Sequence, residues 1–288
     1  MSIKMENVDY VYMQGSPFER KALDNVSLEI KEGEFIGLIG HTGSGKSTLT
    51  QLLNGLSKPS EGSIVVNGFD LTDKKTKMRD VRFCVGLVMQ YPEYQLFEET
   101  VYKDIAFGPS NMGLSEEEIK QRVEDAAKLV GLSEKLLNKS PFDLSGGQKR
   151  RVAIAGVLAM EPKILILDEP TAGLDPAGRD EILSKIKDMH RKRNLTVILV
   201  SHSMEDVAKL ADRILVMNGG KVEMFDTPEK VFSRAERLSS IGLNVPQITE
   251  ITDKLRERGL PLKKGIYTVE DAIESIKKAL EEKGGAIC

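Results

Sequence analysis

A glycine-rich loop that ends in lysine and serine is the feature of this sequence best suited to chemistry. Residues 40–47 follow the apolar run 35–39 and precede a helix-like segment. Glycines carry no Cβ, so the backbone can turn its amides inward, and a helix start adds positive potential. Lys46 suits the β- and γ-phosphates of a polyphosphate, and the Ser47 hydroxyl suits Mg²⁺. The predicted nucleotide contacts are Gly40, His41, Thr42, Gly43, Ser44, Gly45, Lys46, Ser47 and Thr48.

Two adjacent carboxylates follow a second apolar strand, which we expect beside this loop. Asp168 and Glu169 come directly after the apolar residues 164–167. At the tip of the strand, Asp168 can hold Mg²⁺ through its waters. Glu169 lies one residue further, where it can orient and deprotonate an attacking water. The alternative for Glu169 is a solvated acid in a turn.

The segment 144–148, Leu-Ser-Gly-Gly-Gln, predicts a second anion site. It lies before a helix, and Ser145 is a natural N-cap. Gly146 and Gly147 leave the amides of the helix start open, and Gln148 follows them. One phosphate-binding loop needs no second anion site unless two molecules share a nucleotide.

Composition limits the classes of function. The chain has 288 residues and a net charge of −3, which argues against a generally basic nucleic-acid binder. Its two cysteines, Cys84 and Cys288, have neither metal-site nor disulfide spacing, so we expect a reduced, cytosolic setting. We expect no secretory signal at the start, and no run approaches the roughly 18–20 apolar residues of a spanning helix. In a membrane process, this protein would dock on another chain that spans.

The pattern of apolar residues predicts an α/β core interrupted by a helical insert. Residues 1–39 read as β-rich, with a hairpin turn at 31–33, and residues 91–160 show helical periodicity only. A helix over 178–193 is expected to join two parallel strands. Beyond 219–220 the pattern predicts only helices. The predicted strands are 26–30, 34–39, 63–66, 85–89, 164–167 and 196–200. The predicted helix starts are Ser115, Thr227-Pro228 and Thr268, the last followed by an apolar stripe of Ala272, Ile273, Ile276, Ala279 and Leu280.

These motifs, in this order, resemble those of ATP-binding-cassette (ABC) ATPases from about residue 3 to 235. The matching motifs are an A-loop aromatic, Walker A at 40–47, Gln90, the signature at 144–148, Walker B at 164–169, the turn 172–175 and His202. The resemblance implies a P-loop NTPase (RecA-like) core with an N-terminal antiparallel β subdomain. It implies a nucleotide-binding domain over 1–235, with its helical insert at about 91–160, and a C-terminal helical dimerisation appendage over 236–288.

The resemblance also implies how the site works. ATP and Mg²⁺ would lie between two head-to-tail cassettes, with Ser145 and Gly147 contacting the γ-phosphate held by the other subunit. Asp175 would cross the interface, Gln90 would contact Mg²⁺ and the lytic water, and His202 would contact the γ-phosphate and hold the water with Glu169. We expect no chemical role for the rings of His41 and His190. Tyr12 is the expected adenine platform, with Tyr10 as the alternative.

Two segments are similar to those of energy-coupling-factor (ECF) transporter ATPases and their cobalt- and nickel-importer relatives. Residues 90–101 resemble the segment after the family's Q-loop glutamine, and residues 15–23 and 41–44 resemble the second of two ECF ATPase paralogues. The implied function is ATP hydrolysis for an importer of vitamins or transition-metal ions, at the cytoplasmic face of the cell membrane. The implied partners are a second ATPase, a transmembrane coupling subunit and, indirectly, a membrane subunit that binds the substrate.

Aromatic residues gather in the segment 91–107. The chain has six tyrosines and nine phenylalanines, and five of these aromatic residues lie there: Tyr91, Tyr94, Phe97, Tyr102 and Phe107. Aromatics beside acids suit a groove for an amphipathic partner helix. We expect Tyr94 and Phe97 to line this groove, and Tyr102 and Phe107 to pack inside the insert.

Three other functions compete with this hypothesis. A soluble ABC protein acting on nucleic acid or ribosomes usually has two cassettes in one chain, a long coiled coil or zinc-binding cysteines, and this sequence has none of these. The ATPase of an ordinary importer would have a different membrane partner. The ATPase of a dedicated cobalt or nickel importer would pair with itself. An ECF ATPase should instead copurify with a second, different ATPase and a common transmembrane subunit.

Overall fold

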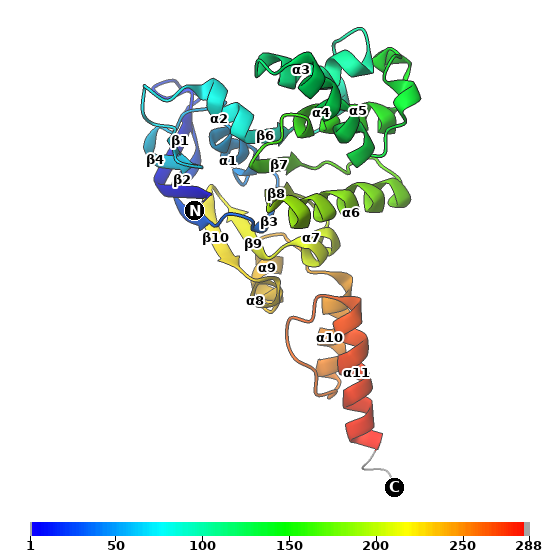
Figure 1. Ribbon diagram of the computed structural model, residues 1–288. Coiled ribbons are helices and arrows are strands. Elements are labelled where there is room, and N and C mark those ends of the chain that lie inside the picture. Colours follow the sequence, from blue (N-terminus) through cyan, green and yellow to red (C-terminus); the bar gives the residue numbers. More distant parts are fainter. Residues whose placement is uncertain (1, 285–288) are drawn as a thin grey trace.

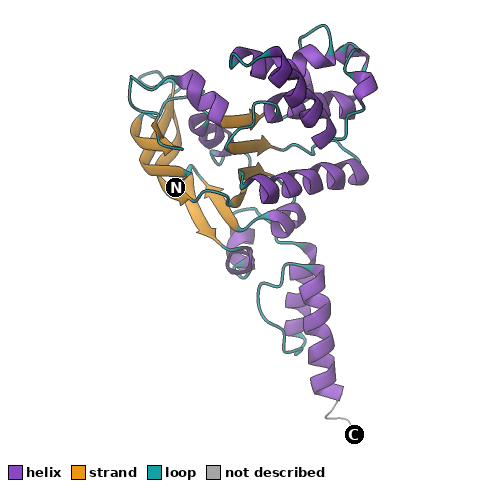
Figure 2. Cartoon of the chain, viewed as in Figure 1, coloured by secondary structure: helices purple, strands orange, loops and turns teal. Residues whose placement is uncertain are grey.

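Two sheets form the body of the protein (Figure 1, Figure 2). The structure is a computed structural model that describes residues 2–284, so Cys288 lies outside the described residues. The larger sheet has the strand order β10-β9-β3-β8-β7-β6 and is parallel except where β10 pairs with β9. Its strands are β3 (Phe35–Gly40), β6 (Val85–Val88), β7 (Ile164–Asp168), β8 (Thr196–Val200), β9 (Arg213–Asn218) and β10 (Lys221–Asp226).

The smaller sheet is antiparallel, with the order β2-β1-β4-β5. Its strands are β1 (Ile3–Tyr12), β2 (Arg20–Ile30), β4 (Glu61–Val66) and β5 (Phe69–Asp70). The hairpin predicted at 31–33 is wrong, because this turn leads from one sheet to the other. The physical reason lies in the two strands: β2 alternates between buried and exposed residues, whereas every residue of β3 is buried. A strand that is apolar throughout needs cover on both faces.

Different elements cover the two faces of the large sheet. On one face, α6 (Pro176–Arg193) and the helical insert pack against Leu165, Leu167, Val197 and Leu199. On the other face, α1 (Lys46–Leu53) and the antiparallel sheet pack against Ile164, Ile166 and Ile198. The predicted β–α–β unit is confirmed as β7, α6 and β8, with β7 and β8 parallel. The short helices α2 (Met78–Cys84) and α7 (Met204–Leu210) complete the body.

The insert is helical, as predicted, and the described chain has no strand between residues 91 and 160. Its elements are η1 (Pro92–Gln95), α3 (Val101–Asn111), α4 (Glu116–Leu129), η2 (Glu134–Leu136), η3 (Pro141–Asp143) and α5 (Gly146–Leu158). A capping box between Ser115 and Glu118 starts α4. Tyr94 and Phe97 are 84% and 58% exposed, and Tyr102 packs against the core. The prediction for Phe107 is wrong: it is 47% exposed, with its ring edge-on to Phe97 at 4.9 Å, because its position on α3 borders an open hollow between α3 and α4.

The C-terminal part corrects another prediction. Beyond residue 220 the chain first forms β10, which hydrogen-bonds to β9, and only then becomes helical. Lys221–Asp226 mixes charged and apolar residues, as expected of a strand at a sheet edge. It therefore lacks the continuous apolar run from which the central strands were predicted. The helices are α8 (Pro228–Phe232), α9 (Ala235–Ser240), α10 (Gln247–Glu257) and α11 (Val269–Gly284).

The last two helices project from the body (Figure 1). The predicted cap of α11 is confirmed, since the Thr268 hydroxyl accepts a hydrogen bond from the Asp271 amide. The residues of the predicted apolar stripe differ in burial. Ala272 and Ala279 are buried, whereas Ile273 and Leu280 are half exposed. Within residues 2–284, no helix is both long enough and apolar enough to cross a bilayer.

Candidate functional site

The predicted loop, carboxylates and histidine line one cavity of about 350 Å³. It lies where the ends of β3, β6, β7 and β8 meet the start of α1. Its walls are formed by Tyr12, Arg20, Ala22, Thr42, Gly43, Gly45, Lys46, Ser47, Thr48, Gln90, Asp168, Glu169 and His202. The carboxyl ends of parallel strands lie at the same edge of a sheet, so residues far apart in the sequence converge there.

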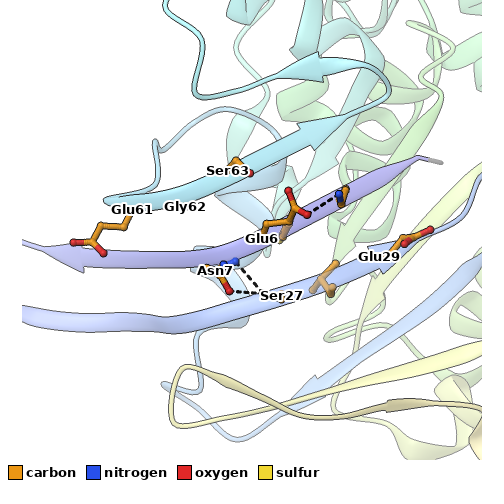
Figure 3. A pocket seen from close by; sticks show the side chains of 10 residues that line it. Glu6, Asn7, Ser27, Glu29, Glu61, Gly62 and Ser63 are labelled. Atoms are coloured by element: carbon orange, nitrogen blue, oxygen red, sulfur yellow. Dashed lines mark hydrogen bonds and ion pairs between the residues drawn. The ribbon is translucent and has the colours of Figure 1, made fainter.

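A larger hollow lies on the antiparallel sheet and has a different character (Figure 3). It has a volume of about 890 Å³ and is lined by residues of β1, β2 and β4. Asn7 and Ser27 hydrogen-bond to each other across it, and Glu6, Glu29 and Glu61 lie around it. It contains none of the predicted site residues, so chemistry rather than volume identifies the candidate site.

The backbone of the loop explains why glycine occupies two of its positions. Gly43 and Gly45 have φ angles of +81° and +103°, which residues with a side chain rarely adopt. A Cβ on Gly45 would also lie 2.8 Å from the Ala22 carbonyl oxygen. This conformation ends directly at the first residue of α1, so the open amides of the helix start face the cavity.

Lys46 is a buried cation at the floor of the cavity. Its Nζ donates to the carbonyl oxygens of Gly40, at 2.6 Å, and of His41, at 3.0 Å. Burial lowers the pKa of Lys46, and the negative charges of Glu169 and Asp168 oppose that shift. A polyphosphate would supply the negative charge that the buried ammonium lacks.

Three predicted members of the loop do not line the cavity: Gly40, His41 and Ser44. A Cβ on Gly40 would lie 2.5 Å from both the Met217 carbonyl oxygen and the Ser44 hydroxyl. The His41 ring lies 3.1 Å from the Asn218 side-chain oxygen. These residues join the loop to β9.

The two carboxylates enter the cavity from the end of β7. Glu169 has a φ of +49°, in the left-handed region, which costs of order 1–3 kcal/mol for a residue with a side chain. Its amide donates to the Val200 carbonyl at 3.0 Å, and its Oε1 lies 2.8 Å from His202 Nε2. Burial raises the pKa of Asp168, and the charge of Glu169 adds to this shift. A nearby cation would reverse it.

The donor atoms around Asp168 fit a magnesium ion. The Ser47 hydroxyl, the Gln90 amide and the Asp168 carboxylate all line the cavity. These are hard oxygen ligands, and Mg²⁺ typically takes only one or two protein carboxylates beside phosphate oxygens and waters.

The structure separates the two candidates for the adenine platform. Tyr12 lines the cavity, and its hydroxyl lies 3.1 Å from the Thr48 hydroxyl. Tyr10 does not line it, but packs edge-on against the Tyr12 ring at 4.7 Å. Tyr10 therefore supports the aromatic ring that faces the site.

The second predicted anion site lies outside this cavity. Ser145, Gly146, Gly147 and Gln148 are absent from its walls. The expected cap is present, because the Ser145 hydroxyl accepts from the Gln148 amide at 3.3 Å while Gln148 Oε1 accepts from the Ser145 amide at 3.0 Å. Asp175 also lies outside the cavity, where its side chain accepts from the Gly178 amide at 2.7 Å and caps α6.

Arg20 is a site residue that sequence reasoning missed. It lies at the start of β2 and lines the cavity. Its Nη2 lies 3.3 Å from the point that a Cβ on Gly43 would occupy, so the guanidinium faces the phosphate-binding loop. Nothing in the spacing of residues 15–23 marks Arg20 as a ligand, because only the pairing of β2 with β1 places it there.

Replacing Arg20 with glutamine is expected to weaken ATP binding about tenfold, because one charge-assisted contact to a phosphate is lost. Arg20→Lys, which keeps the charge, should recover part of that affinity. Titration with a fluorescent ATP analogue measures both. Lys21→Gln is the matched control, since Lys21 is the next residue of β2 but pairs with Asp9 and Asp24. Equal affinities for Arg20→Gln and the unaltered chain would remove Arg20 from the site.

Comparisons with known proteins agree with this geometry. Residues 23–172 match the ABC transporter family. The chain is 62% identical to the energy-coupling factor transporter ATP-binding protein EcfA2 of Caldanaerobacter subterraneus subsp. tengcongensis, over 97% of this chain and 98% of that protein. It is 61% identical to the EcfA2 of Clostridium tetani, over 98% and 99%.

Solved structures show the same fold. The structure of cbiO1 from Clostridium perfringens, described as part of the ABC transporter complex cbiONQ, has a TM-score of 0.73 and 41% identity and covers 87% of this chain and 98% of its own. The dimeric cassette MJ0796 bound to ADP and Pi has a TM-score of 0.71 and 32% identity, with coverage of 78% and 98%. The P-loop NTPase fold expected from the motifs is thus confirmed. The chain belongs to the ABC transporter family, within its energy-coupling factor transporter ATP-binding proteins.

Proposed function

We propose that this chain is the ATP-hydrolysing subunit of an ECF-type importer, held at the cytoplasmic face of the cell membrane by a transmembrane partner. The observation that carries the proposal is the single cavity that joins Lys46, Asp168, Glu169 and His202 in a member of this family. ATP binding would close two cassettes on each other and move the partner, and hydrolysis would release it.

The residues of the cavity divide the work of hydrolysis. The loop amides, Lys46 and Arg20 bind the phosphates, and Tyr12 stacks on the adenine. Glu169 takes a proton from the attacking water, while His202, 2.8 Å away, holds the Glu169 carboxylate and contacts the γ-phosphate. Ser47, Gln90 and Asp168 would hold Mg²⁺, which supplies positive charge for the phosphate oxygens. No covalent intermediate is needed.

The signature turn at 145–148 would act on the nucleotide of a second cassette. Its capped helix start is open to an anion, yet it is not part of the cavity in its own chain. A head-to-tail dimer brings such a turn to the partner's γ-phosphate, with Asp175 crossing the interface. The second cassette would be an ECF ATPase paralogue, or a second copy of this chain in a dedicated cobalt or nickel importer. The half-exposed apolar residues Ile273 and Leu280 of α11 would help to pair the subunits.

The groove proposed for the transmembrane coupling subunit runs over the helical insert. A hollow of about 860 Å³ lies between α3 and α4, lined by Tyr102, Ala106, Phe107 and Ile119 with acids and lysines around them. Phe97 lies against Phe107, and Tyr94 is almost fully exposed nearby in the sequence. Apolar walls with a charged rim suit an amphipathic helix.

Purification through this chain from its own membranes tests the proposed function. We expect a second ATPase and an integral membrane subunit, identified by mass spectrometry. The double variant Tyr94→Ser/Phe97→Ser should lose the membrane subunit. Phe97 contacts Phe107 in the wall of the hollow and Tyr94 is exposed, and truncation of aromatic anchors weakens an interface strongly. The double variant should still bind ATP, since neither residue lines the nucleotide cavity.

Leu56→Ser is the matched control for this experiment. Leu56 is also a half-exposed apolar residue, but it follows α1 on the cassette body rather than the insert. It should retain every partner. Copurification with ribosomes or nucleic acid, without a membrane subunit, would overturn the proposed function. Recovery of this ATPase alone with a membrane subunit would favour the homodimeric importer.

A further inference from the structure

Arg150 is a buried cation outside the nucleotide cavity. Among the residues that the structure describes, only two basic side chains are buried, Lys46 and Arg150. The side chain of Arg150 is 5% exposed and that of its partner Glu93 is 17% exposed. A guanidinium is tolerated away from water only where it is paired and hydrogen-bonded, so its partners reveal what holds it there.

All three nitrogens of the Arg150 guanidinium are engaged. Nε donates to Glu93 Oε2 at 3.1 Å and Nη2 donates to Glu93 Oε1 at 2.9 Å. Nη1 donates to the carbonyl oxygen of Ala172. The two parallel bonds to Glu93 form the bidentate geometry that only arginine provides. The third bond leads to a different segment, so one side chain joins three parts of the chain.

Each of these three parts belongs to the site or its surroundings. Glu93 lies in η1, three residues after Gln90 and one before the exposed Tyr94. Ala172 lies in the turn between Glu169 and Asp175, and its amide donates to the Glu169 carbonyl at 3.2 Å. Arg150 itself lies on the second turn of α5, the helix that begins at the Ser145 cap.

The signature turn and the 172–175 turn are also in direct reach of each other. A Cβ on Gly147 would lie 3.7 Å from Leu174 Cδ2. Arg150 thus connects three segments. It binds η1 through Glu93, it lies on the helix that begins at the Ser145 turn, and through Ala172 it binds the turn that carries Asp175.

We propose that Arg150 is a positioning residue that makes η1, the start of α5 and the 172–175 turn move as one unit. A displacement of η1 by a docked partner would then reach the Ser145 turn and Asp175 without passing through the nucleotide cavity. The inference rests on the proposed function, because it assumes that these two turns complete a site in a second cassette.

The neighbouring arginine does not share these contacts. Arg151 donates to the Glu181 carboxylate at 2.7 Å and to the Val130 carbonyl at 2.8 Å, which ties α5 to α6 and to the end of α4. Two successive arginines on α5 therefore serve different neighbours, and only Arg150 reaches both η1 and the 172–175 turn.

Kinetics of the purified transporter complex test the proposal. Arg150→Gln and Glu93→Gln should each lower kcat about 10- to 100-fold, as expected for a loss of alignment at about the 1 Å level. The Kd for ATP should change less than about twofold, because neither residue lines the nucleotide cavity. The double variant should be no slower than the slower single variant, since residues that act through one contact do not add. Arg150→Lys, which keeps the charge without the fork, should be intermediate.

Arg122→Gln is the matched control. Arg122 donates to the Ala159 and Met160 carbonyls at the far end of α5 and pairs with Glu161. It should lower the melting temperature without changing kcat. The proposal is overturned if the losses of kcat in the two single variants add up in the double variant. It is also overturned if, across all variants including Arg122→Gln, kcat falls only where the melting temperature falls.

The wild-type complex separates this proposal from the one on which it rests. A wild-type preparation without a membrane subunit or without ATPase activity would refute the proposed function. An active wild-type complex whose Glu93→Gln and Arg150→Lys variants turn over at the same rate would refute only the positioning role of Arg150.

Discussion

Glu169→Gln is expected to slow ATP hydrolysis by a factor of about 10² to 10⁴, the usual contribution of a general base. This factor corresponds to roughly 3–5 kcal/mol of activation free energy. The amide has the shape of the carboxylate and can still face His202, but it cannot take a proton from water. Release of inorganic phosphate from saturating ATP measures the effect.

ATP binding should survive this substitution. The negative charge of Glu169 adds to the raised pKa of Asp168, so its removal leaves Asp168 more fully ionised and better suited to a cation. Glu161→Gln is the control, because Glu161 pairs with Arg122 and Arg193 away from the cavity and should hydrolyse ATP normally. Unchanged turnover in Glu169→Gln would assign the base to another residue.

Lys46→Ala is expected to weaken nucleotide binding about 10- to 100-fold, and hydrolysis at limiting ATP should fall with it. Lys46 is the buried cation of the cavity, and the loop carbonyls that it now contacts would lose their donor. Titration with a fluorescent ATP analogue gives the dissociation constant directly.

Lys74→Ala, at an exposed lysine in the loop after β5, is the control and should bind ATP normally. The melting temperature of Lys46→Ala must also be measured, because a cavity at a buried site can destabilise the domain. A folded Lys46→Ala variant with the affinity of the unaltered chain would mean that the nucleotide does not lie against this loop.

Much of the site could be predicted because its chemistry is local in the sequence. The loop at 40–47, the pair Asp168-Glu169 and the Ser145 cap each need a few adjacent residues of particular types, and each has a strand or helix boundary beside it. The strand boundaries were predicted to within one residue, since β3, β7 and β8 are continuous apolar runs whose burial on both faces admits few other interpretations.

The failures occur where local pattern and tertiary context differ. Edge strand β10 carries charged residues because only Met224 in it is buried, so its sequence resembles a loop or helix. The 31–33 turn looks like a hairpin, yet the two strands it joins enter different sheets. Phenylalanine is a residue type usually found in cores, so Phe107 was expected to be buried. Only the packing of α3 shows that it is half exposed beside Phe97.

The types and order of residues were enough to specify nucleotide chemistry, because phosphate, Mg²⁺ and water each demand particular atoms at short spacing along the chain. The partnerships of Arg20 with the loop at Gly43, and of Arg150 with Glu93 and Ala172, depend on the folded chain. Arg150 is separated from Glu93 by 57 residues and from Ala172 by 22. Contacts over such separations leave no pattern in the local sequence. The residues around an arginine do not show whether it lies on a solvated helix face or in a buried ion pair, because that depends on how the helices pack.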